Sequence, residues 1–333
     1  MTPEESITLI KANLAEVLNP EIIDDVILKQ SRPLRVYWGT APTGKPHCGY
    51  FVPMVKIAEL LHAGCHVKIL LADKHALMDS QAPLEEIKYR CEYYRLLIQS
   101  SLKAIGVDVS KLEFVVGSSF QETREYEVDR FRFSNNVTVS QLIKAGSEVV
   151  KQSKNPTLGS VEYPIWQSLD EEYLGVGVEL GGLGFKVRAH LMNAMVPGLG
   201  EAQKMSSSEP SSKINLLDSP EEVTKKLRKA VCAPKEVEGN GVVAFIEHVI
   251  FRVESLKTNG EPRFTLKEDY ASDILTPQMI KPALIKALND LLDPIRKDFE
   301  SDEEWKRIAN LAYPVQEKPE RGNKVKNNGK RSK

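Results

Sequence analysis

Short apolar segments alternate with helical patterns in the first third of the chain, and this alternation limits the possible folds more than any other feature. Residues 34–40, 67–73 and 114–117 are apolar runs of strand length. Between them, residues 51–61 and 84–104 carry apolar side chains at helical spacing. Strands that alternate with helices form βαβ units, which build a parallel sheet through right-handed crossovers. We therefore expect an α/β fold that binds its ligands at the carboxyl ends of the strands.

The rest of the chain is mostly helical in pattern. Residues 1–30 carry apolar side chains spaced for one helix face, and residues 119–160 form a polar, helical insertion between two halves of the sheet. Residues 186–192 fit a returning strand. From about residue 219 the pattern is helical and indicates a second domain. Its expected helices are residues 221–231, 242–251 and 277–299.

The amino-acid composition limits which partners and cellular locations we expect for the protein. The 45 basic and 46 acidic residues leave a net charge of −1, so nucleic-acid binding would need a local basic patch. Residues 318–333 hold seven Lys or Arg and one acid, a net charge of +6, and we expect them to be disordered. The four cysteines are scattered, which favours reduced thiols over a metal site. With no long apolar run and an acidic N-terminus, we expect a cytoplasmic protein with no membrane partner.

One segment, residues 42–50, has the features of a phosphate site. His47 and Tyr50 are three residues apart and share one face at the start of the expected helix. A helix N-terminus offers unpaired N–H groups to an anion, while Gly44 and Gly49 leave room for a nucleotide to approach. His47 could donate a hydrogen bond to phosphate charge that develops in a transition state. Taken alone, the segment could equally be an ordinary strand–helix turn with a surface histidine.

A second segment contains Lys204 followed by Met205, Ser206, Ser207 and Ser208. Serines favour turns, and lysine is a mobile charge suited to a polyphosphate, although an isolated segment of this kind could be a solvated loop. The joint occurrence is more informative. One segment follows the first strand and the other follows a late strand, an arrangement that is hard to obtain by accident.

Tyr163, Gln167 and Asp170 are spaced to form one polar stripe on a helix that we expect to start near Pro164. Such a stripe could be the solvated face of the helix. It could also line a binding pocket, and the spacing alone leaves both readings open.

These segments together resemble tyrosyl-tRNA synthetases of the eukaryotic and archaeal type, a family of class I aminoacyl-tRNA synthetases. Residues 42–50 and 204–208 resemble the two ATP-handling motifs of that class, in variant forms. The resemblance runs from about residue 5 to residue 315. It is carried by residues 37–50, 71–76, 163–170, 190–193, 204–208 and 291–296.

The resemblance implies specific roles. Tyr37 and Asp170 would hydrogen-bond the phenolic hydroxyl of tyrosine, and Tyr163 and Gln167 would hold its amino group. The residues implied in catalysis are His47, Tyr50 and Lys204. The residues implied in ATP binding are Gly39, Thr43, Gly44, His47, Gly49, Lys204, Met205, Ser206, Ser207 and Ser208. ATP would be a substrate that brings Mg²⁺, with no tightly bound cofactor and no metal site in the protein.

The resemblance also implies an architecture and partners. We expect a Rossmann-type catalytic domain followed by an all-α anticodon-binding domain, usually as a homodimer, with tRNA(Tyr), L-tyrosine and ATP as partners. The expected parts are an N-terminal helical segment (1–30), the catalytic domain (31–218), an insertion for the dimer interface or acceptor stem (119–160), the anticodon-binding domain (219–315) and a disordered basic tail (316–333).

The sequence departs from the family in two places. After Gly182 the family continues with an acid, Gln-Arg-Lys and a helix, whereas this chain runs directly to residue 186, so about one helix is missing. The missing glutamine would help hold the amino group of tyrosine. Met279 stands where an acidic anticodon-reading residue is expected, so we assign no anticodon residue.

We expect ATP-dependent attachment of tyrosine to tRNA through tyrosyl-adenylate, weakened by the missing segment. Two alternatives remain open at this point. One is an inactive synthetase relic that binds tRNA or regulates, and the other is a tryptophan-specific ligase of the same fold, which would leave Tyr37 and Asp170 without a phenol to bind.

Overall fold

The computed structural model describes residues 1–80, 82–146, 155–180, 187–200, 213–258 and 266–314. The described strands form one six-stranded sheet in the order β1-β6-β5-β2-β3-β4. Only the β1–β6 pair is antiparallel among the described pairings. The strands are β1 (Glu16–Leu18), β2 (Arg35–Thr40), β3 (His66–Leu71), β4 (Leu112–Val116), β5 (Val178–Leu180) and β6 (Ala189–Met192).

Strand β2 lies at the point where the strand order reverses. The chain leaves β2 toward β3 and β4 on one side, and later returns to β5 and β6 on the other side. Val36 of β2 therefore pairs with Val67 of β3 and with Val178 of β5. Ligands of open α/β sheets bind at the carboxyl ends of the strands at such a reversal. The end of β2 is thus the expected place for a site.

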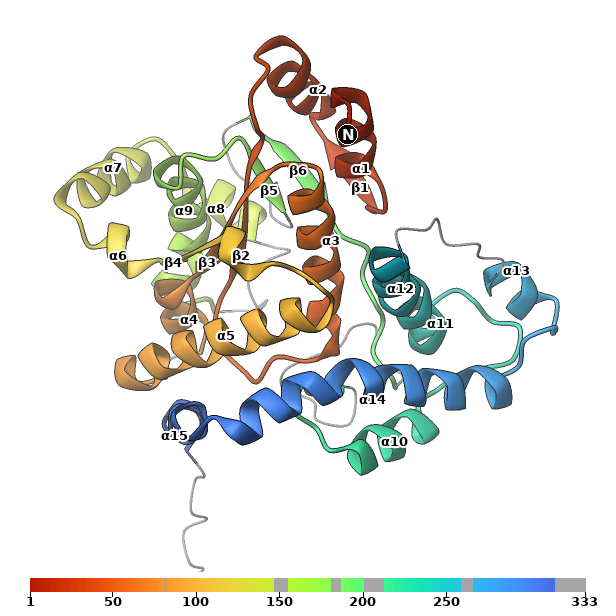
Figure 1. The fold of residues 1–333 in the computed structure, drawn as a ribbon. Helices are drawn as coiled ribbons and strands as arrows, with labels where there is room; N and C mark the ends of the chain where they lie inside the picture. Colours follow the sequence, from red (N-terminus) through yellow and green to blue (C-terminus); the bar gives the residue numbers. More distant parts are fainter. Residues whose placement is uncertain (81, 147–154, 181–186, 201–212, 259–265, 315–333) are drawn as a thin grey trace, which may run out of the picture.

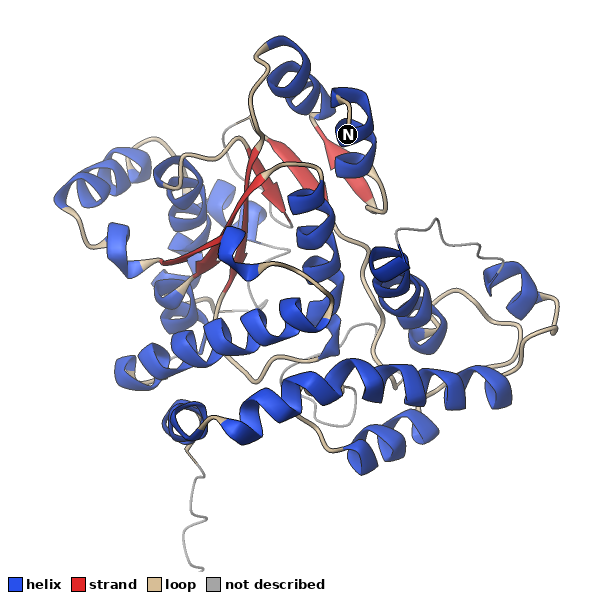
Figure 2. Ribbon diagram, in the orientation of Figure 1, coloured by secondary structure: helices blue, strands red, loops and turns tan. Residues whose placement is uncertain are grey.

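Helices lie on both faces of this sheet (Figure 2). Because both faces are covered, four of the six residues of β3 are buried, including three in succession at its carboxyl end. Val36 and Ile69 are fully buried in the resulting core, together with Phe51 and Leu97. The helices that connect these first strands are α3 (Phe51–His62), α4 (Asp73–Ser80) and α5 (Leu84–Ala104).

The insertion between β4 and β5 is helical, as the sequence predicts. Its elements are α6 (Ser118–Gln121), α7 (Arg124–Ser134), α8 (Val139–Gly146) and α9 (Leu158–Tyr173). Helix α9 packs on α4, α7 and α8, and Thr157 caps its start by accepting a hydrogen bond from the Ser160 N–H at 3.3 Å. Helix α9 thereby connects the insertion to the edge of the sheet where β2 ends.

All the described secondary structure after residue 218 is helical, with loops between the helices. Its helices are α10 (Pro220–Lys229), α11 (Gly241–Phe245), α12 (Phe251–Thr258), α13 (Leu266–Ala271), α14 (Pro277–Ser301) and α15 (Glu303–Ala312), with a π-helical turn (Ile246–Ile250) between α11 and α12. Helices α14 and α15 pack against α5 (Figure 1). Ser100 of α5 donates a hydrogen bond to Asp298 of α14 at 2.7 Å. None of the described helices has the length and apolar composition needed to cross a bilayer.

The prediction of a helical segment over residues 1–30 is wrong in its middle. The segment contains α1 (Pro3–Lys11), strand β1, α2 (Pro20–Asp24) and a π-helical turn (Asp25–Lys29). Asn13 and Asn19 adopt left-handed backbone conformations, which interrupt the helix on both sides of β1. Strand β1 forms because it can pair with β6, a partner that no local pattern reveals. The sequence patterns also did not predict α4, β5, α12, α13 or α15.

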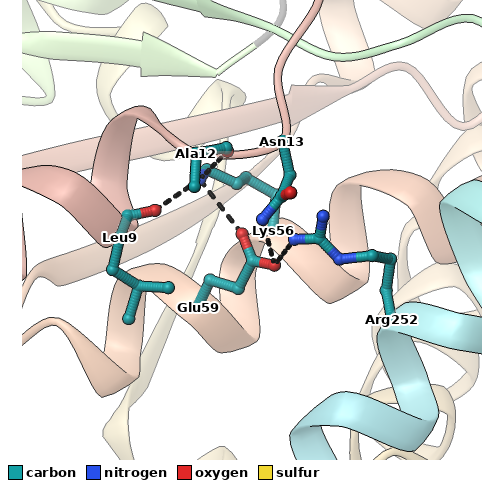
Figure 3. Close-up of polar contacts among 6 residues, drawn as sticks. All are labelled: Leu9, Ala12, Asn13, Lys56, Glu59 and Arg252. Carbon is teal, nitrogen blue, oxygen red and sulfur yellow. Dashed lines mark hydrogen bonds and ion pairs between the residues drawn. The ribbon is translucent and has the colours of Figure 1, made fainter. Parts of the chain in front are cut away.

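A buried polar network joins the N-terminal segment, α3 and α12 (Figure 3). The Lys56 ammonium of α3 donates to the carbonyls of Leu9 and Ala12 at 2.9 and 2.8 Å, and to Glu59 at 3.1 Å. Glu59 also accepts a hydrogen bond from Arg252 of α12. Three regions of the chain therefore meet at α3, the helix that directly follows the His47 segment.

Candidate active site

The four residues expected to bind tyrosine line one cavity of about 150 Å³ at the end of β2. Tyr37 comes from β2, and Tyr163, Gln167 and Asp170 come from α9. The reading of Tyr163, Gln167 and Asp170 as a solvated face is therefore wrong, since all three face the cavity and Asp170 is 1% exposed. Other lining residues are Trp38, Gly39, Thr40, Ala41, Leu70, Ala72, His75 and Leu180.

The expected helix start near Pro164 is wrong. Helix α9 begins at Leu158, so Pro164 lies inside the helix, where it lacks the N–H that would bond the preceding turn. The Ser168 hydroxyl donates to the Pro164 carbonyl at 3.0 Å. The stripe of three polar residues keeps its helical spacing past the proline, so the direction of the side chains is as expected.

Polar side chains from three other helices surround Asp170. Its Oδ1 atom accepts hydrogen bonds from the Tyr126 hydroxyl at 2.8 Å and from the Gln121 amide at 2.7 Å. The Nδ1 atom of His75 lies 3.7 Å from Oδ2. His75 also packs edge-on against Tyr163, with ring centroids 4.4 Å apart. His75 lies on α4, within residues 71–76, one of the segments that carry the resemblance. Gln121 of α6 and Tyr126 of α7 lie outside all of those segments.

Tyr37 is 2% exposed, and its ring packs beside Gly39, two residues along the same strand. A Cβ atom on Gly39 would lie 3.3 Å from the Tyr37 ring and 3.7 Å from Leu70. A side chain at position 39 would therefore crowd the Tyr37 ring at the cavity wall. This is a packing reason for glycine there, in addition to the nucleotide contact that the resemblance implies.

His47 caps the short helical turn Cys48–Tyr50 that precedes α3. Its Nδ1 atom accepts a hydrogen bond from the Gly49 N–H at 3.1 Å. An accepting Nδ1 carries no proton, so the neutral ring carries its proton on Nε2. Burial, with the nearby charge of Lys213, lowers the pKa of His47 to about 4. At neutral pH, His47 is thus an uncharged donor through Nε2–H.

The expectation of unpaired N–H groups in this turn is wrong. The Cys48 N–H bonds to the Ile214 carbonyl at 2.8 Å, and the Tyr50 N–H bonds to the His47 carbonyl at 2.9 Å. Together with the Gly49 N–H, these donors are already used inside the protein. Side chains therefore have to provide most of the polar contacts to an anion at this turn.

Lys213 is a further basic residue at this end of the site, and it lies outside both segments that the sequence predicts to bind ATP. It is 5% exposed and lies one residue before the segment that pairs with the His47 segment, through the His47–Asn215 bridge. Burial lowers its pKa, and so do the nearby charges of Lys226 and Lys45. Buried positive charge beside His47 is suited to a polyphosphate.

Helices α5 and α15 hold the glycine-containing loop of residues 41–46. The Arg90 guanidinium donates to the Thr43 carbonyl at 3.0 Å and to the Ala312 carbonyl at 2.9 Å. The Tyr94 hydroxyl donates to the Gly44 carbonyl. Tyr50, three residues after His47, shares a hydrogen bond with Thr40 at 3.1 Å. The loop is therefore positioned by α5 and, through Arg90, by the end of α15.

Some predicted residues lie outside the described residues. These are Lys204, Met205, Ser206, Ser207 and Ser208, and the junction after Gly182. The four cysteines are free, and burial raises the pKa of Cys65 and Cys91 to about 12. Within the described residues, no group of three or more His, Cys, Asp and Glu side chains could hold a metal ion.

Comparison with protein families gives a match over most of the chain. The model for "tRNA synthetases class I (W and Y)" matches residues 29–184 and 182–293. The two matched parts meet at residues 182–184, where the sequence predicts a missing stretch.

Two relatives are named "Tyrosine--tRNA ligase, cytoplasmic". The one from Saccharomyces cerevisiae is 44% identical over 365 aligned positions, which cover 98% of this chain and 93% of the relative. The one from Xenopus tropicalis is 46% identical and covers 94% of this chain, which in turn spans 64% of that longer relative. The first alignment is longer than the 333-residue chain, as expected if this chain lacks residues that the relative has.

Solved structures are also similar. The tyrosyl-tRNA synthetase from Pyrococcus horikoshii, complexed with L-tyrosine, has a TM-score of 0.82 and 28% identity, covering 92% of this chain and 99% of the other. A tryptophanyl-tRNA synthetase from Aeropyrum pernix has a TM-score of 0.66 and 19% identity, covering 90% of this chain and 86% of the other. The second likeness concerns the fold alone.

Proposed function

The chain belongs to the class I tRNA synthetases for tryptophan and tyrosine, and from this membership we propose that it attaches L-tyrosine to tRNA(Tyr) at the expense of ATP. The tyrosine ligases among its relatives match nearly the whole chain. We propose a cytoplasmic enzyme because those relatives carry that location in their names.

One observation supports this function above all others. Tyr37 and Asp170 face the same cavity, and there they offer a hydroxyl and a carboxylate to a ligand. A phenolic hydroxyl can donate to the carboxylate and accept from Tyr37, whereas an indole ring has no hydroxyl to pair with them. A hydroxyl-bearing ring can use both groups, so this pocket favours tyrosine over tryptophan. Tyr163 and Gln167 would hold the amino group of the same ligand.

ATP would bind beside this cavity, at the His47 turn. We propose that a carboxylate oxygen of tyrosine attacks the α-phosphorus of ATP. A new O–P bond forms, the bond to the β-phosphate oxygen breaks, and pyrophosphate leaves. The Nε2–H of His47 would donate to the phosphate as charge develops on it, Tyr50 would support the turn, and Lys204 and Lys213 would hold the leaving pyrophosphate.

The other ATP contacts come from the two loops. Gly39, Thr43, Gly44 and Gly49 would lie along the nucleotide on one side. Met205, Ser206, Ser207 and Ser208 would also bind the nucleotide, as the resemblance implies. We propose that Mg²⁺ arrives on the phosphates of ATP, as is common for phosphoryl chemistry.

In the second step, a hydroxyl of the tRNA 3′-end attacks the tyrosyl carbonyl and AMP leaves. The protein supplies position and charge in both steps, with no covalent enzyme intermediate. We propose that residues 219–315 form the anticodon-binding domain and that residues 316–333 add a basic tail. Met279 of α14 is 54% exposed, and we assign no anticodon contact to it.

We propose a homodimer that forms through the insertion. Helices α7, α8 and α9 leave large apolar side chains in solvent, which marks an interaction surface. These are Val128, Phe131, Val139, Ile143 and Leu158, between 39% and 73% exposed.

Tyrosine-dependent exchange of pyrophosphate into ATP tests the function. Exchange with tyrosine and not with tryptophan supports the proposal. Exchange with tryptophan alone would identify the tryptophan-specific alternative. Binding of tRNA without any exchange would identify an inactive relic, for which the missing stretch after Gly182 is the motive.

Tyr37→Phe tests the pocket itself. It should weaken tyrosine binding by about 1–3 kcal/mol, because it leaves a polar partner unmatched. The control is Tyr93→Phe, which alters a buried tyrosine of α5 that does not line the cavity. Normal tyrosine affinity in Tyr37→Phe would mean that tyrosine binds elsewhere.

A further inference from the structure

We propose that Tyr126 and Gln121 are positioning residues that set the preference for tyrosine over phenylalanine, by fixing the carboxylate of Asp170. This inference rests on the proposed function and extends it. Neither residue lines the cavity, so both would act through Asp170.

The geometry places two donors on one oxygen. The Tyr126 hydroxyl and the Gln121 amide both donate to Asp170 Oδ1, at 2.8 and 2.7 Å. All three residues are buried, with exposures of 0%, 4% and 1%. Hydrogen bonds to a carboxylate favour its ionised form, and two of them on Oδ1 also fix its rotation. Oδ2 is thereby directed toward His75, which does line the cavity, with Nδ1 at 3.7 Å.

Tyr126 is itself held firmly. Its ring packs against Phe120, Trp166 and Tyr173, with centroid separations of 5.9, 5.7 and 4.9 Å. Its hydroxyl also lies 3.1 Å from the Trp166 carbonyl. Burial raises the pKa of Tyr126 far above its ordinary value, and the charge of Asp170 raises it further. The hydroxyl therefore keeps its proton and remains a donor to Asp170.

This arrangement affects one substrate group only. The phenolic hydroxyl of tyrosine can donate to an ionised, correctly oriented Asp170 oxygen, and such charge-assisted bonds are stronger than neutral ones. Phenylalanine has no hydroxyl and gains nothing from Asp170. Loosening Asp170 should therefore weaken tyrosine binding and leave phenylalanine binding unchanged.

The test measures equilibrium binding of tyrosine and phenylalanine to the full chain by calorimetry. Tyr126→Phe and Gln121→Met should each weaken tyrosine binding about 10-fold, with phenylalanine binding unchanged. The matched control is Tyr173→Phe, which removes a hydroxyl from the same aromatic cluster, where it donates to Asp129 at 3.0 Å. Tyr173→Phe should leave both affinities as they are.

A double variant keeps the test independent of general effects on folding. In an Asp170→Asn background, Tyr126→Phe should cost no further tyrosine affinity, because its effect passes through the carboxylate. Equal weakening for both amino acids, additive losses in the double variant, or the same loss in Tyr173→Phe would each overturn the proposal. An unmodified chain that binds no tyrosine would overturn the proposed function, and this inference with it.

Discussion

Glu59 of α3 and Arg252 of α12 form an ion pair although they are 193 residues apart in the sequence. The pair connects the helix that follows the His47 turn to the helical C-terminal part (Figure 3). Glu59 also accepts hydrogen bonds from the Lys56 ammonium at 3.1 Å and from the Asn13 amide at 3.3 Å. The placement of α3, and so of the turn before it, therefore depends on residues of the N-terminal segment and of α12.

Removing one charge from this network should be costly. Lys56→Met removes one donor from each of the Leu9 and Ala12 carbonyls and one cation from Glu59, so we expect the free energy of unfolding to fall by about 3–5 kcal/mol. Arg252→Met should cost about 1.5–3 kcal/mol, since the pair lies nearer to solvent. Urea unfolding gives both values. Lys267→Met, which breaks an exposed ion pair with Glu247, is the control and should change stability by less than about 0.5 kcal/mol. Similar losses in all three variants would contradict a special role for the network.

His47 should titrate at a much lower pH than an ordinary histidine, because burial lowers its pKa in the folded protein to about 4. The unfolded chain binds the proton more readily, so the stability that neutral His47 contributes is fully present above about pH 6.5. It is lost as pH falls toward 4. The protonation of His47 should therefore cause no change in the rate of pyrophosphate exchange between pH 6 and pH 7.5. Proton NMR of the ring, assigned by its disappearance in His47→Asn, measures the pKa. A midpoint near 6.5 would mean that the imidazole is not buried as described.

Lys204 and Lys213 should act on ATP and not on tyrosine. Lys204→Ala and Lys213→Met should each slow adenylate formation far more than they weaken tyrosine binding, because their charge is needed chiefly when negative charge moves to the leaving pyrophosphate. Presteady-state adenylate formation and tyrosine binding separate the two effects. Lys225→Met, on the exposed face of α10, is the matched control. Parallel losses in rate and tyrosine affinity would indicate a structural role for the lysine concerned.

The missing stretch after Gly182 should reduce both activity and stability. The family glutamine there would add a charge-assisted bond to the amino group of tyrosine, worth about 1.5–3 kcal/mol, or one to two decades of affinity. The absent helix would also remove a packing partner from its neighbours. A chain with the family's acid-Gln-Arg-Lys helix inserted should bind tyrosine more tightly and unfold at a higher temperature. Equal exchange rates and equal thermal midpoints in the two chains would show that the shorter junction is harmless.

Patterns among neighbouring residues in the sequence were sufficient to predict some of the helices and strands. Residues 84–104 form α5 as expected, because their apolar spacing continues over the whole length of the helix. Strand β2 and the turn at His47 were also predictable, and so was the stripe of Tyr163, Gln167 and Asp170, because the spacing of a helix fixes which side chains share a face.

Other features depend on contacts between residues that are distant in the sequence, and only the folded structure reveals them. Strand β1 exists because it pairs with β6, and α3 is held by Arg252 of α12. Tyr126 and Gln121 reach Asp170 only after the insertion has folded onto α9. Lys213 reaches His47 because residues 214–216 pair with the turn beside it. Contacts of this kind join residues tens to hundreds of positions apart, and no short-range pattern in the sequence encodes them.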